Sequence, residues 1–366
     1  MDLPLSMSKK QDLSIKRYPA STNRSLQAWS AVDEHILKHL NEVDIATSTV
    51  ISYGDSFGFL TAHVAPKTHY VVVDSASQEG AIGKNIAENK IKLLFHFLNP
   101  LQKPKLKPKL GLIKIPKSLD LFELYLDHFT QHASVKGELV CGFMTRHFTK
   151  QMLEIAGQYF EDVSQSLAWK KSRFLILKKI KKQPKKDLIN QILHKKETIS
   201  QYFGVFSSKM IDPASQFLIE YLPKPTDKSK VMDLACGNGI LGKMLLSQNP
   251  TIAVHLVDDS FLAIASAKLN VQGPNVHFHQ VHDLDKFEPN SFDIIASNPP
   301  FHVEHEIDIS LPIRLFREAH TVLKPGGLLQ VVANQHLNYK THLIKIFSKV
   351  DVIAEQDKYV VYSCEK

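Results

Sequence analysis

Length and composition bound the kind of protein that this chain can be. It has 366 residues, 43% hydrophobic and 22% charged, which is typical of a globular protein and more than one compact domain usually needs. No apolar run approaches the roughly 20 residues that span a bilayer, and the first residues lack a secretory signal, so we expect no membrane contact. Three widely spaced cysteines without CxxC spacing predict neither disulfides nor a metal site, and they fit a cytoplasmic location.

The excess positive charge is confined to the first half of the chain. Residues 1–200 hold 30 Lys and Arg against 19 Asp and Glu, a net charge of +11, whereas residues 201–366 hold 15 against 18, a net charge of −3. Lysine runs at residues 103–109 and 178–186 suit contact with a polyanion, although a single run is often only a solvated surface. An excess over half the chain favours a nucleic-acid partner.

In chain order, the first half alternates short apolar runs with amphipathic stretches. Strands are predicted at residues 49–53, 70–74, 92–97, 110–115, 138–143 and 173–177, and helices at 26–40, 119–131 and 149–159. This alternation predicts a mostly parallel α/β sheet with helices on its faces. Gly54 to Gly58 and Asp74 follow the first two strands, as a cofactor turn and a ribose-binding acid would, but the glycine pattern of such a turn is missing. We therefore expect residues 1–190 to be a degenerate copy of the second half, with a lysine-rich linker at 178–201.

The second half, residues 191–366, repeats the α/β pattern and adds a glycine-rich turn. Its predicted strands are 230–234, 253–258, 276–280, 292–297, 327–333, 349–353 and 359–363. The first strand carries Asp233 and is followed by Gly237 and Gly239, in a stretch that matches the dinucleotide fingerprint GxGxxG. A pyrophosphate gains nothing from a nearby carboxylate, whereas the ammonium of S-adenosylmethionine pairs with one. The pattern therefore favours S-adenosylmethionine over NAD.

Two further acidic residues follow the next strands of this half. Asp258 ends its strand 25 residues after Asp233, where an acid can accept hydrogen bonds from two ribose hydroxyls. An NAD enzyme would use the same position, so Asp258 does not discriminate between the cofactors. Asp283 follows the third strand, where it can meet an adenine amino group while Leu284 packs on the ring. Upstream, Phe206 lies either over the cofactor or as a hydrophobic staple on the entering helix.

The fourth strand ends in Asn298-Pro-Pro-Phe301, the most specific motif of the chain. An exocyclic amine is a poor nucleophile because its lone pair is delocalised, so an enzyme must orient it. The Asn298 side-chain oxygen and the Pro299 carbonyl can accept from its N–H groups and stabilise developing positive charge. Pro299 and Pro300 stiffen the loop, and Phe301 offers a flat face for an extruded base. The motif predicts methylation of an amino nitrogen, with no metal required.

Together these motifs resemble the bacterial guanine-N2 methyltransferases of ribosomal RNA. Looser matches at residues 26–34, 112–117, 167–171 and 332–337 resemble the large-subunit RlmG family. The resemblance implies two tandem class I methyltransferase-like (Rossmann-like) domains. The first is degenerate and RNA-binding, and the second has a seven-stranded sheet with an antiparallel last strand. Ala235 with Cys236, and Gln335, depart from the commoner residues of the family.

The resemblance also implies the site residues and the substrate. The residues that bind the cofactor are then Asp233, Ala235, Cys236, Gly237, Asn238, Gly239, Asp258, Asp283 and Leu284, and those that clasp the guanine are Asn298, Pro299, Pro300 and Phe301. The substrate is 23S ribosomal RNA, naked or in an assembling large subunit. Sister enzymes of the small subunit share the catalytic motifs, so 16S RNA is an alternative. Two further alternatives are a methyltransferase of an adenine or a glutamine amide, and a non-catalytic assembly factor that keeps a relic pocket.

Overall fold

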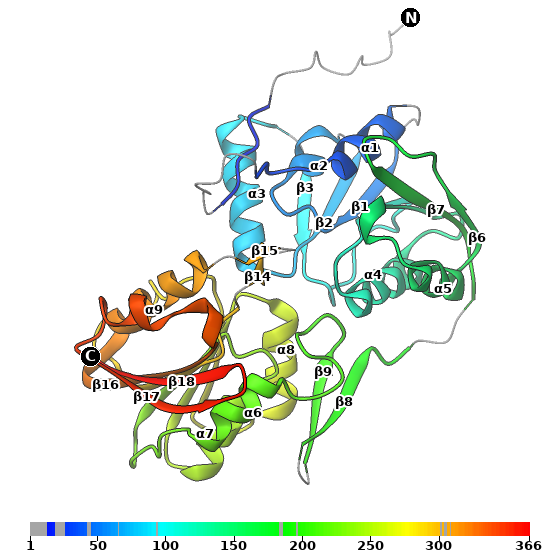
Figure 1. Ribbon diagram of the computed structural model, residues 1–366. Coiled ribbons are helices and arrows are strands. Elements are labelled where there is room, and N and C mark those ends of the chain that lie inside the picture. Colours follow the sequence, from blue (N-terminus) through cyan, green and yellow to red (C-terminus); the bar gives the residue numbers. More distant parts are fainter. Residues whose placement is uncertain are drawn as a thin grey trace, which may run out of the picture. The chain divides into compact units, whose positions relative to one another are not determined.

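The structure is a computed structural model in which the chain forms two compact α/β units (Figure 1). It describes residues 13–18, 26–41, 45–64, 66–92, 94–182, 186–194, 197–300, 302–303, 306–307 and 309–366. The boundary between the main bodies of the two units falls at Lys186 and Asp187. In the part of the chain that the structure describes, no helix is both long and apolar enough to cross a membrane.

The first unit is built on a seven-stranded sheet in the order β3-β2-β1-β4-β5-β7-β6. Its strands are β1 (Thr49–Tyr53), β2 (Thr68–Val72), β3 (Phe95–Leu98), β4 (Leu110–Lys114), β5 (Glu138–Met144), β6 (Phe160–Gln165) and β7 (Ser172–Ile180). Its helices are α1 (Ala31–Leu40), α2 (Phe59–His63), α3 (Ala76–Glu88), α4 (Leu119–His132), η1 (Thr145–His147) and α5 (Lys150–Tyr159). Strand β7 is antiparallel to both neighbours, and the other pairs are parallel.

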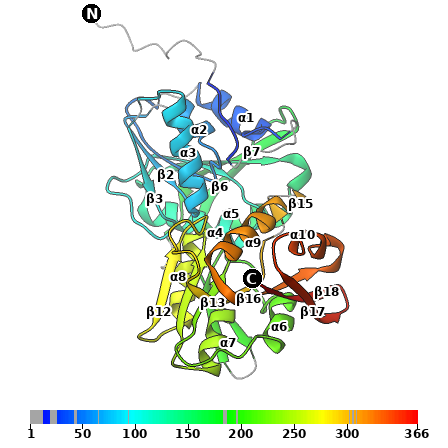
Figure 2. The ribbon, with the colours of Figure 1, turned by 90° about the vertical axis from the view of Figure 1, so that its left-hand side faces the viewer.

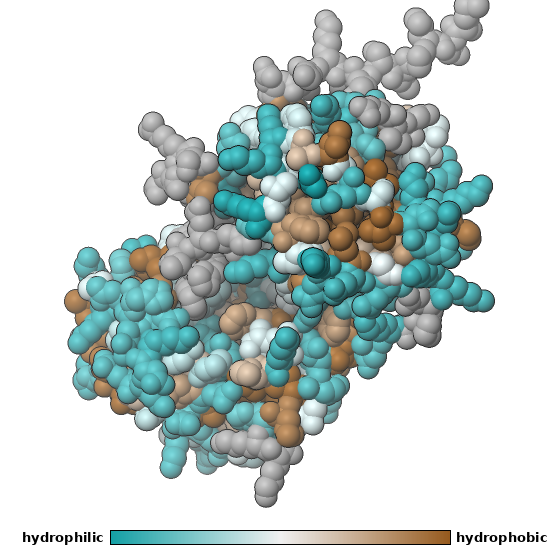
Figure 3. Space-filling model, turned by 45° about the vertical axis from the view of Figure 1, so that its right-hand side comes forward, coloured by the Kyte–Doolittle hydropathy of each residue, from teal (hydrophilic) through white to brown (hydrophobic). Residues whose placement is uncertain are grey.

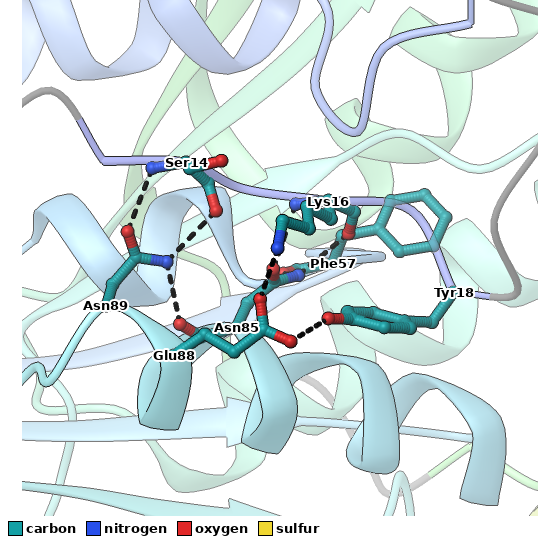
Figure 4. A network of polar contacts seen from close by, with 7 residues as sticks. All are labelled: Ser14, Lys16, Tyr18, Phe57, Asn85, Glu88 and Asn89. Atoms are coloured by element: carbon teal, nitrogen blue, oxygen red, sulfur yellow. Dashed lines mark hydrogen bonds and ion pairs between the residues drawn. The ribbon is translucent and has the colours of Figure 1, made fainter.

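A short segment near the start of the chain is tied to helix α3 of the first unit (Figure 4). The Ser14 backbone N–H donates to the Asn89 side-chain oxygen at 2.8 Å, and the Lys16 N–H donates to that of Asn85 at 2.9 Å. The Lys16 ammonium adds an ion pair with Glu88 at 2.7 Å. The extended segment is thus fixed by side-chain amides that replace strand pairing.

The second unit repeats the same sheet order, β12-β11-β10-β13-β16-β18-β17. Its strands are β10 (Lys230–Leu234), β11 (Ala253–Asp258), β12 (Val276–Gln280), β13 (Phe292–Ser297), β16 (Leu323–Asn334), β17 (Lys349–Gln356) and β18 (Tyr359–Glu365), with a small pair β14 (His302–Val303) and β15 (Glu306–Ile307). Its helices are α6 (Pro213–Glu220), α7 (Ile240–Gln248), α8 (Phe261–Asn270), α9 (Ser310–Val322), η2 (Gln335–Leu337) and α10 (Lys340–Leu343). The last strand, β18, runs antiparallel between β16 and β17 at one side of the sheet (Figure 2). The prediction of a seven-stranded sheet with an antiparallel last strand is confirmed.

The core of the second unit lies on both faces of its sheet. Val231 of β10 packs into the apolar cluster on one face, and the adjacent Met232 packs into the cluster on the other. Both side chains are fully buried, as expected for a central parallel strand covered by helices on both sides. Apolar runs of this kind explain why the sequence predicts the central strands β10, β11 and β13 with their observed bounds.

The expected linker at residues 178–201 is wrong over most of its length. Strand β7 continues to Ile180, and β8 (Ile189–His194) and β9 (Glu197–Tyr202) form an antiparallel hairpin. Ile192 and Ile199 are paired across the hairpin and are buried in the core of the second unit. Among the described residues of the hairpin, Ile192, Ile199 and Gln201 are buried, so the lysine-rich composition of this segment was a poor guide to its structure.

Candidate active site

A glycine-rich turn joins β10 to α7 and forms the centre of the site. Ala235, Gly237 and Gly239 have φ values of 57°, 53° and 82°, so three residues of one turn adopt the left-handed conformation. A side chain on Gly239 would place its Cβ 2.9 Å from the Leu256 side chain, whereas a Cβ on Gly237 would meet nothing within 4 Å. The turn is therefore packed against the sheet at Gly239 and open at Gly237.

The Asp233 carboxylate lies directly beneath this turn. It is fully buried, and its Oδ2 accepts a hydrogen bond from the Gly242 N–H at 2.7 Å. Its Oδ1 is buried without a hydrogen-bond partner. Burial raises the pKa of Asp233 to about 8, although the Gly242 hydrogen bond favours the ionised form. A buried oxygen with no partner is costly, and a bound cation would relieve that cost.

Asp258, at the end of β11, is positioned by two backbone donors. Its Oδ2 accepts from the Gly237 N–H at 2.9 Å and its Oδ1 accepts from the Ser260 N–H at 2.9 Å. Burial raises the pKa of Asp258 to about 6. Each carboxylate oxygen has a second lone pair available, so Asp258 can still accept from two hydroxyl groups of a ligand.

Side chains from the hairpin and α8 hold the turn in place. The Asn238 side chain donates to the Gln201 Oε1 at 2.7 Å, and the Asn270 side chain donates to the Asn238 carbonyl at 2.8 Å. Gln201 is fully buried and its amide group lies within 3.1 Å of the Val205 carbonyl. Sequence reasoning missed Gln201 and Asn270, because nothing in their local sequence marks them as neighbours of the turn.

The loop after β9 places Phe206 in solvent, which bears on whether Phe206 acts as a hydrophobic staple. Phe206 is 70% exposed, whereas the adjacent Val205 is buried. Since a staple must pack its side chain against the helix, Phe206 does not act as one.

The third acidic residue, Asp283, lies beyond β12 and is partly exposed. Its carboxylate forms a contact of 2.9 Å with the His282 ring, and Leu284 is buried in the apolar cluster on one face of the sheet. The Leu284 N–H donates to the Glu318 carboxylate of α9 at 3.2 Å.

Asn298 follows β13 and is held by two residues at the start of α6. Its side-chain nitrogen donates to the Asp212 Oδ2 at 2.9 Å and to the Ser215 Oγ at 2.9 Å. Asp212 also caps α6 by accepting from the Ser215 N–H at 3.1 Å. Both amide hydrogens are thus committed to the protein, and Asn298 Oδ1 takes no hydrogen bond from any described residue. Its position as an acceptor is fixed by the two partners.

The rest of the predicted Asn-Pro-Pro-Phe loop is described as far as Pro300. Pro299 is buried, Pro300 is exposed, and Phe301 lies outside the described residues. Just upstream, the Ser297 hydroxyl donates to the Leu234 carbonyl at 2.7 Å, which joins the end of β13 to the end of β10. The loop and the glycine-rich turn therefore begin from neighbouring strands at the same edge of the sheet.

The residues around the turn fit S-adenosylmethionine. Asp233 offers an unpartnered buried oxygen for an ammonium group, and Gly237 leaves open space beside it. Asp258 keeps lone pairs for ribose hydroxyls. An acid at the first strand and another at the second, in a sheet with an antiparallel last strand, define a class I methyltransferase whose methyl donor is S-adenosylmethionine.

Comparisons with known proteins agree with this class. The family model for the RLMG N-terminal domain matches residues 5–185, and that for the methyltransferase small domain matches residues 196–363. The chain is 31% identical over 364 residues to ribosomal RNA large subunit methyltransferase G of Pseudoalteromonas translucida (strain TAC 125), covering 96% of this chain and 95% of that protein. It is 32% identical over 373 residues to the protein of the same name from Shewanella loihica (strain ATCC BAA-1088 / PV-4), covering 96% and 92%. The chain belongs to the ribosomal RNA large subunit methyltransferase G family.

A solved structure shares the whole two-unit fold. The 16S rRNA N2 G1207 methyltransferase RsmC of T. thermophilus, in complex with AdoMet and guanosine, matches with a TM-score of 0.74 and 20% identity. The match covers 92% of both chains. It confirms the expected architecture of two tandem methyltransferase-like domains.

Proposed function

We propose that this protein methylates the exocyclic N2 amine of a guanine in 23S ribosomal RNA. The observation that carries the proposal is the fixed orientation of Asn298, whose Oδ1 is left as an acceptor. Two relatives that are similar over nearly their full length are named as large-subunit enzymes, which favours 23S over 16S RNA. The RNA is naked or in an assembling large subunit.

Asn298 and Pro299 perform the positioning that an amino group requires. The guanine N2 lone pair is delocalised into the ring, so the nitrogen attacks only when it is held in line with the methyl carbon. The Asn298 Oδ1 and the Pro299 carbonyl accept from the two N–H groups and stabilise the positive charge that develops on nitrogen. Pro300 keeps the loop rigid, and Phe301 stacks on the extruded base. S-adenosylmethionine, when bound, supplies the activated methyl group on its sulfonium sulfur.

The cofactor is held by the turn and by the acids at its edge. Asp233 receives the methionine ammonium, and the backbone from Ala235 to Gly239, which includes Cys236, Gly237 and Asn238, lies along the methionine end. Asp258 accepts from the ribose hydroxyls. Asp283 and Leu284 contact the adenine. The first domain (residues 1–190 in our assignment) supplies RNA affinity through its excess of lysine and arginine, and the second (191–366) performs the methyl transfer.

Transfer of a tritiated methyl group tests this proposal. Labelled cofactor is incubated with unmodified 23S or 16S RNA, and the methylated nucleoside is identified by mass spectrometry. Wild-type protein should label 23S RNA as N2-methylguanosine. Asn298→Ala should reduce labelling by at least about a hundredfold, because one of two acceptors is lost, while cofactor affinity changes by less than about threefold.

The control is Asn275→Ala, which removes an exposed asparagine before β12 and should leave labelling unchanged. Label in N6-methyladenosine, in 16S RNA alone, or undiminished in Asn298→Ala would overturn the proposal. A wild-type protein that binds no cofactor would instead identify a non-catalytic assembly factor.

A further inference from the structure

The first unit has a small pocket that plays no part in the chemistry described above. Its volume is about 170 Å³, and its lining residues are Phe143, Thr145, Phe148, Gln165 and Arg173. They come from the carboxyl end of β5, the short helix η1 and the adjoining ends of β6 and β7. Ligands of parallel α/β sheets bind at this carboxyl edge.

Arg173 brings an unused charge into the pocket. It pairs with Phe143 across the β5–β7 ladder, and its Nε atom is buried without a hydrogen-bond partner. No described acidic side chain forms an ion pair with it. A buried guanidinium nitrogen without an acceptor is costly, so the pocket favours a ligand that brings acceptor atoms.

An aromatic surface lies opposite this charge. The rings of Phe143 and Phe148 are stacked, with centroids 5.5 Å apart and an interplanar angle of 28°. Phe143 is buried and supports Phe148, which is partly exposed. Single-stranded RNA bases are recognised by such rings, since every base has a flat face to stack on them.

The rim of the pocket is positively charged. Residues 144–151 and 164–175 contain five Lys and Arg residues and no Asp or Glu. On this rim the Lys170 ammonium lies 4.6 Å from the Trp169 ring centroid and forms an ion pair with Glu34 at 2.8 Å, so the charge of Lys170 is partly balanced. Figure 3, in which the β6 and β7 side of the first unit comes forward, shows apolar side chains among hydrophilic ones on that unit. A phosphate backbone would meet cations here while a base entered the pocket.

We infer that this pocket binds one unpaired nucleotide of the substrate RNA, with the base stacked on Phe148 and hydrogen-bonded by Arg173. The inference rests on the proposed function for the identity of the RNA. A free anion would use Arg173 alone and would leave the aromatic surface without a role. The combination of a flat aromatic surface, a guanidinium and a cationic rim matches a nucleotide in all three respects.

RNA affinity of three variants tests the inference. Arg173→Gln removes a charge in the pocket, Lys150→Gln removes one on the rim outside it, and Phe148→Ala removes the ring without changing charge. Binding of unmodified 23S RNA is measured at several salt concentrations, with thermal unfolding and cofactor affinity as checks on folding. Gln165→Ala, at an exposed position, replaces Arg173→Gln if the latter lowers stability.

Phe148→Ala should weaken RNA binding about tenfold at every salt concentration, because stacking is not screened. Lys150→Gln should weaken RNA binding only a few-fold and lower the slope of affinity against salt concentration by about one. Arg173→Gln should weaken RNA binding clearly more than Lys150→Gln does. Photo-crosslinks from thiouridine-substituted RNA should map to residues 143–148 or 165–173. The inference is overturned if Phe148→Ala binds like wild type, if Arg173→Gln matches Lys150→Gln, or if crosslinks map elsewhere. If the pocket inference fails in this way but the wild type still methylates 23S RNA, the proposed function stands. If the wild type does not methylate 23S RNA, both the inference and the proposed function are wrong.

Discussion

At the scale of single residues, the proposed contact between Asp233 and the cofactor ammonium makes cofactor binding depend on the protonation of Asp233. Burial raises the pKa of Asp233 to about 8, so the free protein holds a proton there at pH 7. An ammonium group beside the carboxylate stabilises the ionised form. Binding at pH 7 should therefore release a proton. Affinity should rise as pH increases from 6 toward about 7.5, by at most tenfold per unit, and fall again above about 8, where the α-amino group of the cofactor loses its own proton.

Calorimetry at pH 7 in two buffers of different ionisation enthalpy measures this proton release directly. Asp258 is mostly ionised at this pH, since its pKa is about 6, so Asp258→Asn should weaken binding but preserve most of the release. Asp233→Asn should abolish the release together with most of the affinity. An observed enthalpy that is the same in both buffers would show that Asp233 is already ionised in the free protein.

The sequence predicted the acids of the site better than it predicted their partners. Asp233 and Asp258 end apolar strands, and the strand pattern places such residues at one edge of the sheet. The anchors of Asn298 could not be found in this way, because Asp212 and Ser215 lie 86 and 83 residues earlier in the chain. Asp212 before Pro213 is recognisable as a helix start, but its second contact depends on tertiary packing.

At the scale of elements, the start of helix α6 both caps the helix and holds the Asn298 side chain. Asp212 caps the helix and accepts from Asn298, while Ser215 provides the second acceptor. Without these partners, the Asn298 side chain could rotate and present its nitrogen to the substrate amine. Ser215→Ala should therefore lower kcat about tenfold, equivalent to roughly 1.4 kcal/mol, with a smaller effect on KM.

Asp212→Ala removes the anchor and the cap together, so it should lower kcat and also cost about 1 kcal/mol of stability. Asp212→Asn is its matched control, because asparagine caps helices well and its side-chain oxygen can still accept from Asn298. Recovery of kcat in Asp212→Asn separates positioning from loss of stability. If kcat in Ser215→Ala equals that of wild type, α6 has no positioning role.

The accuracy of the predicted elements follows their burial. Strands β10, β11 and β13 are central and largely apolar, and the sequence predicts their bounds directly. Strand β6 lies at the edge of its sheet, and four of its six residues are exposed, so its sequence lacks an apolar pattern. Hairpin β8–β9 was missed for the related reason that Ile192 and Ile199 are the only described apolar residues of the hairpin in the core. Periodicity identifies an element only where one whole face is buried.

At the scale of the whole molecule, strand register shows how the first unit departs from the second. Tyr53 of β1 pairs with Val72, as Leu234 of β10 pairs with Val257. The residue after Val72 is Val73, so a valine stands where the second unit has Asp258. The expectation that Asp74 parallels Asp258 is therefore wrong by one position.

The residue at the position of Asn298 also differs in the first unit. Tyr53 pairs with Ile113, as Leu234 pairs with Ser297, so Lys114 stands where the second unit has Asn298. The Lys114 ammonium forms an ion pair at 3.0 Å with the buried Asp33. A cation at this position cannot accept a hydrogen bond from an amine.

The turn of the first unit is filled by its own side chain. Asp55 accepts from the Gly58 N–H at 3.1 Å and from the Thr61 N–H and hydroxyl at 2.7 Å each. Thr61 follows the left-handed Gly58 by three residues, as Gly242 follows Gly239, so Asp55 replaces Asp233 as the partner of this helix. Both carboxylate oxygens of Asp55 accept hydrogen bonds within the turn, whereas the Oδ1 atom of Asp233 has no hydrogen-bond partner.

These three replacements predict a single cofactor site in a molecule with two similar sheets. Calorimetric titration should give one S-adenosylmethionine per chain, and Asp233→Asn should reduce the number of sites to none at the same cofactor concentrations. Asp55→Ala removes the corresponding carboxylate of the first unit, so it should leave both the number of sites and the affinity unchanged, provided that its unfolding transition shows it to be folded. Two sites in the wild type, or one remaining in Asp233→Asn, would mean that the first unit binds the cofactor despite Val73 and Lys114. In that case the basic first unit could not be described as an RNA-binding relic of a duplicated enzyme.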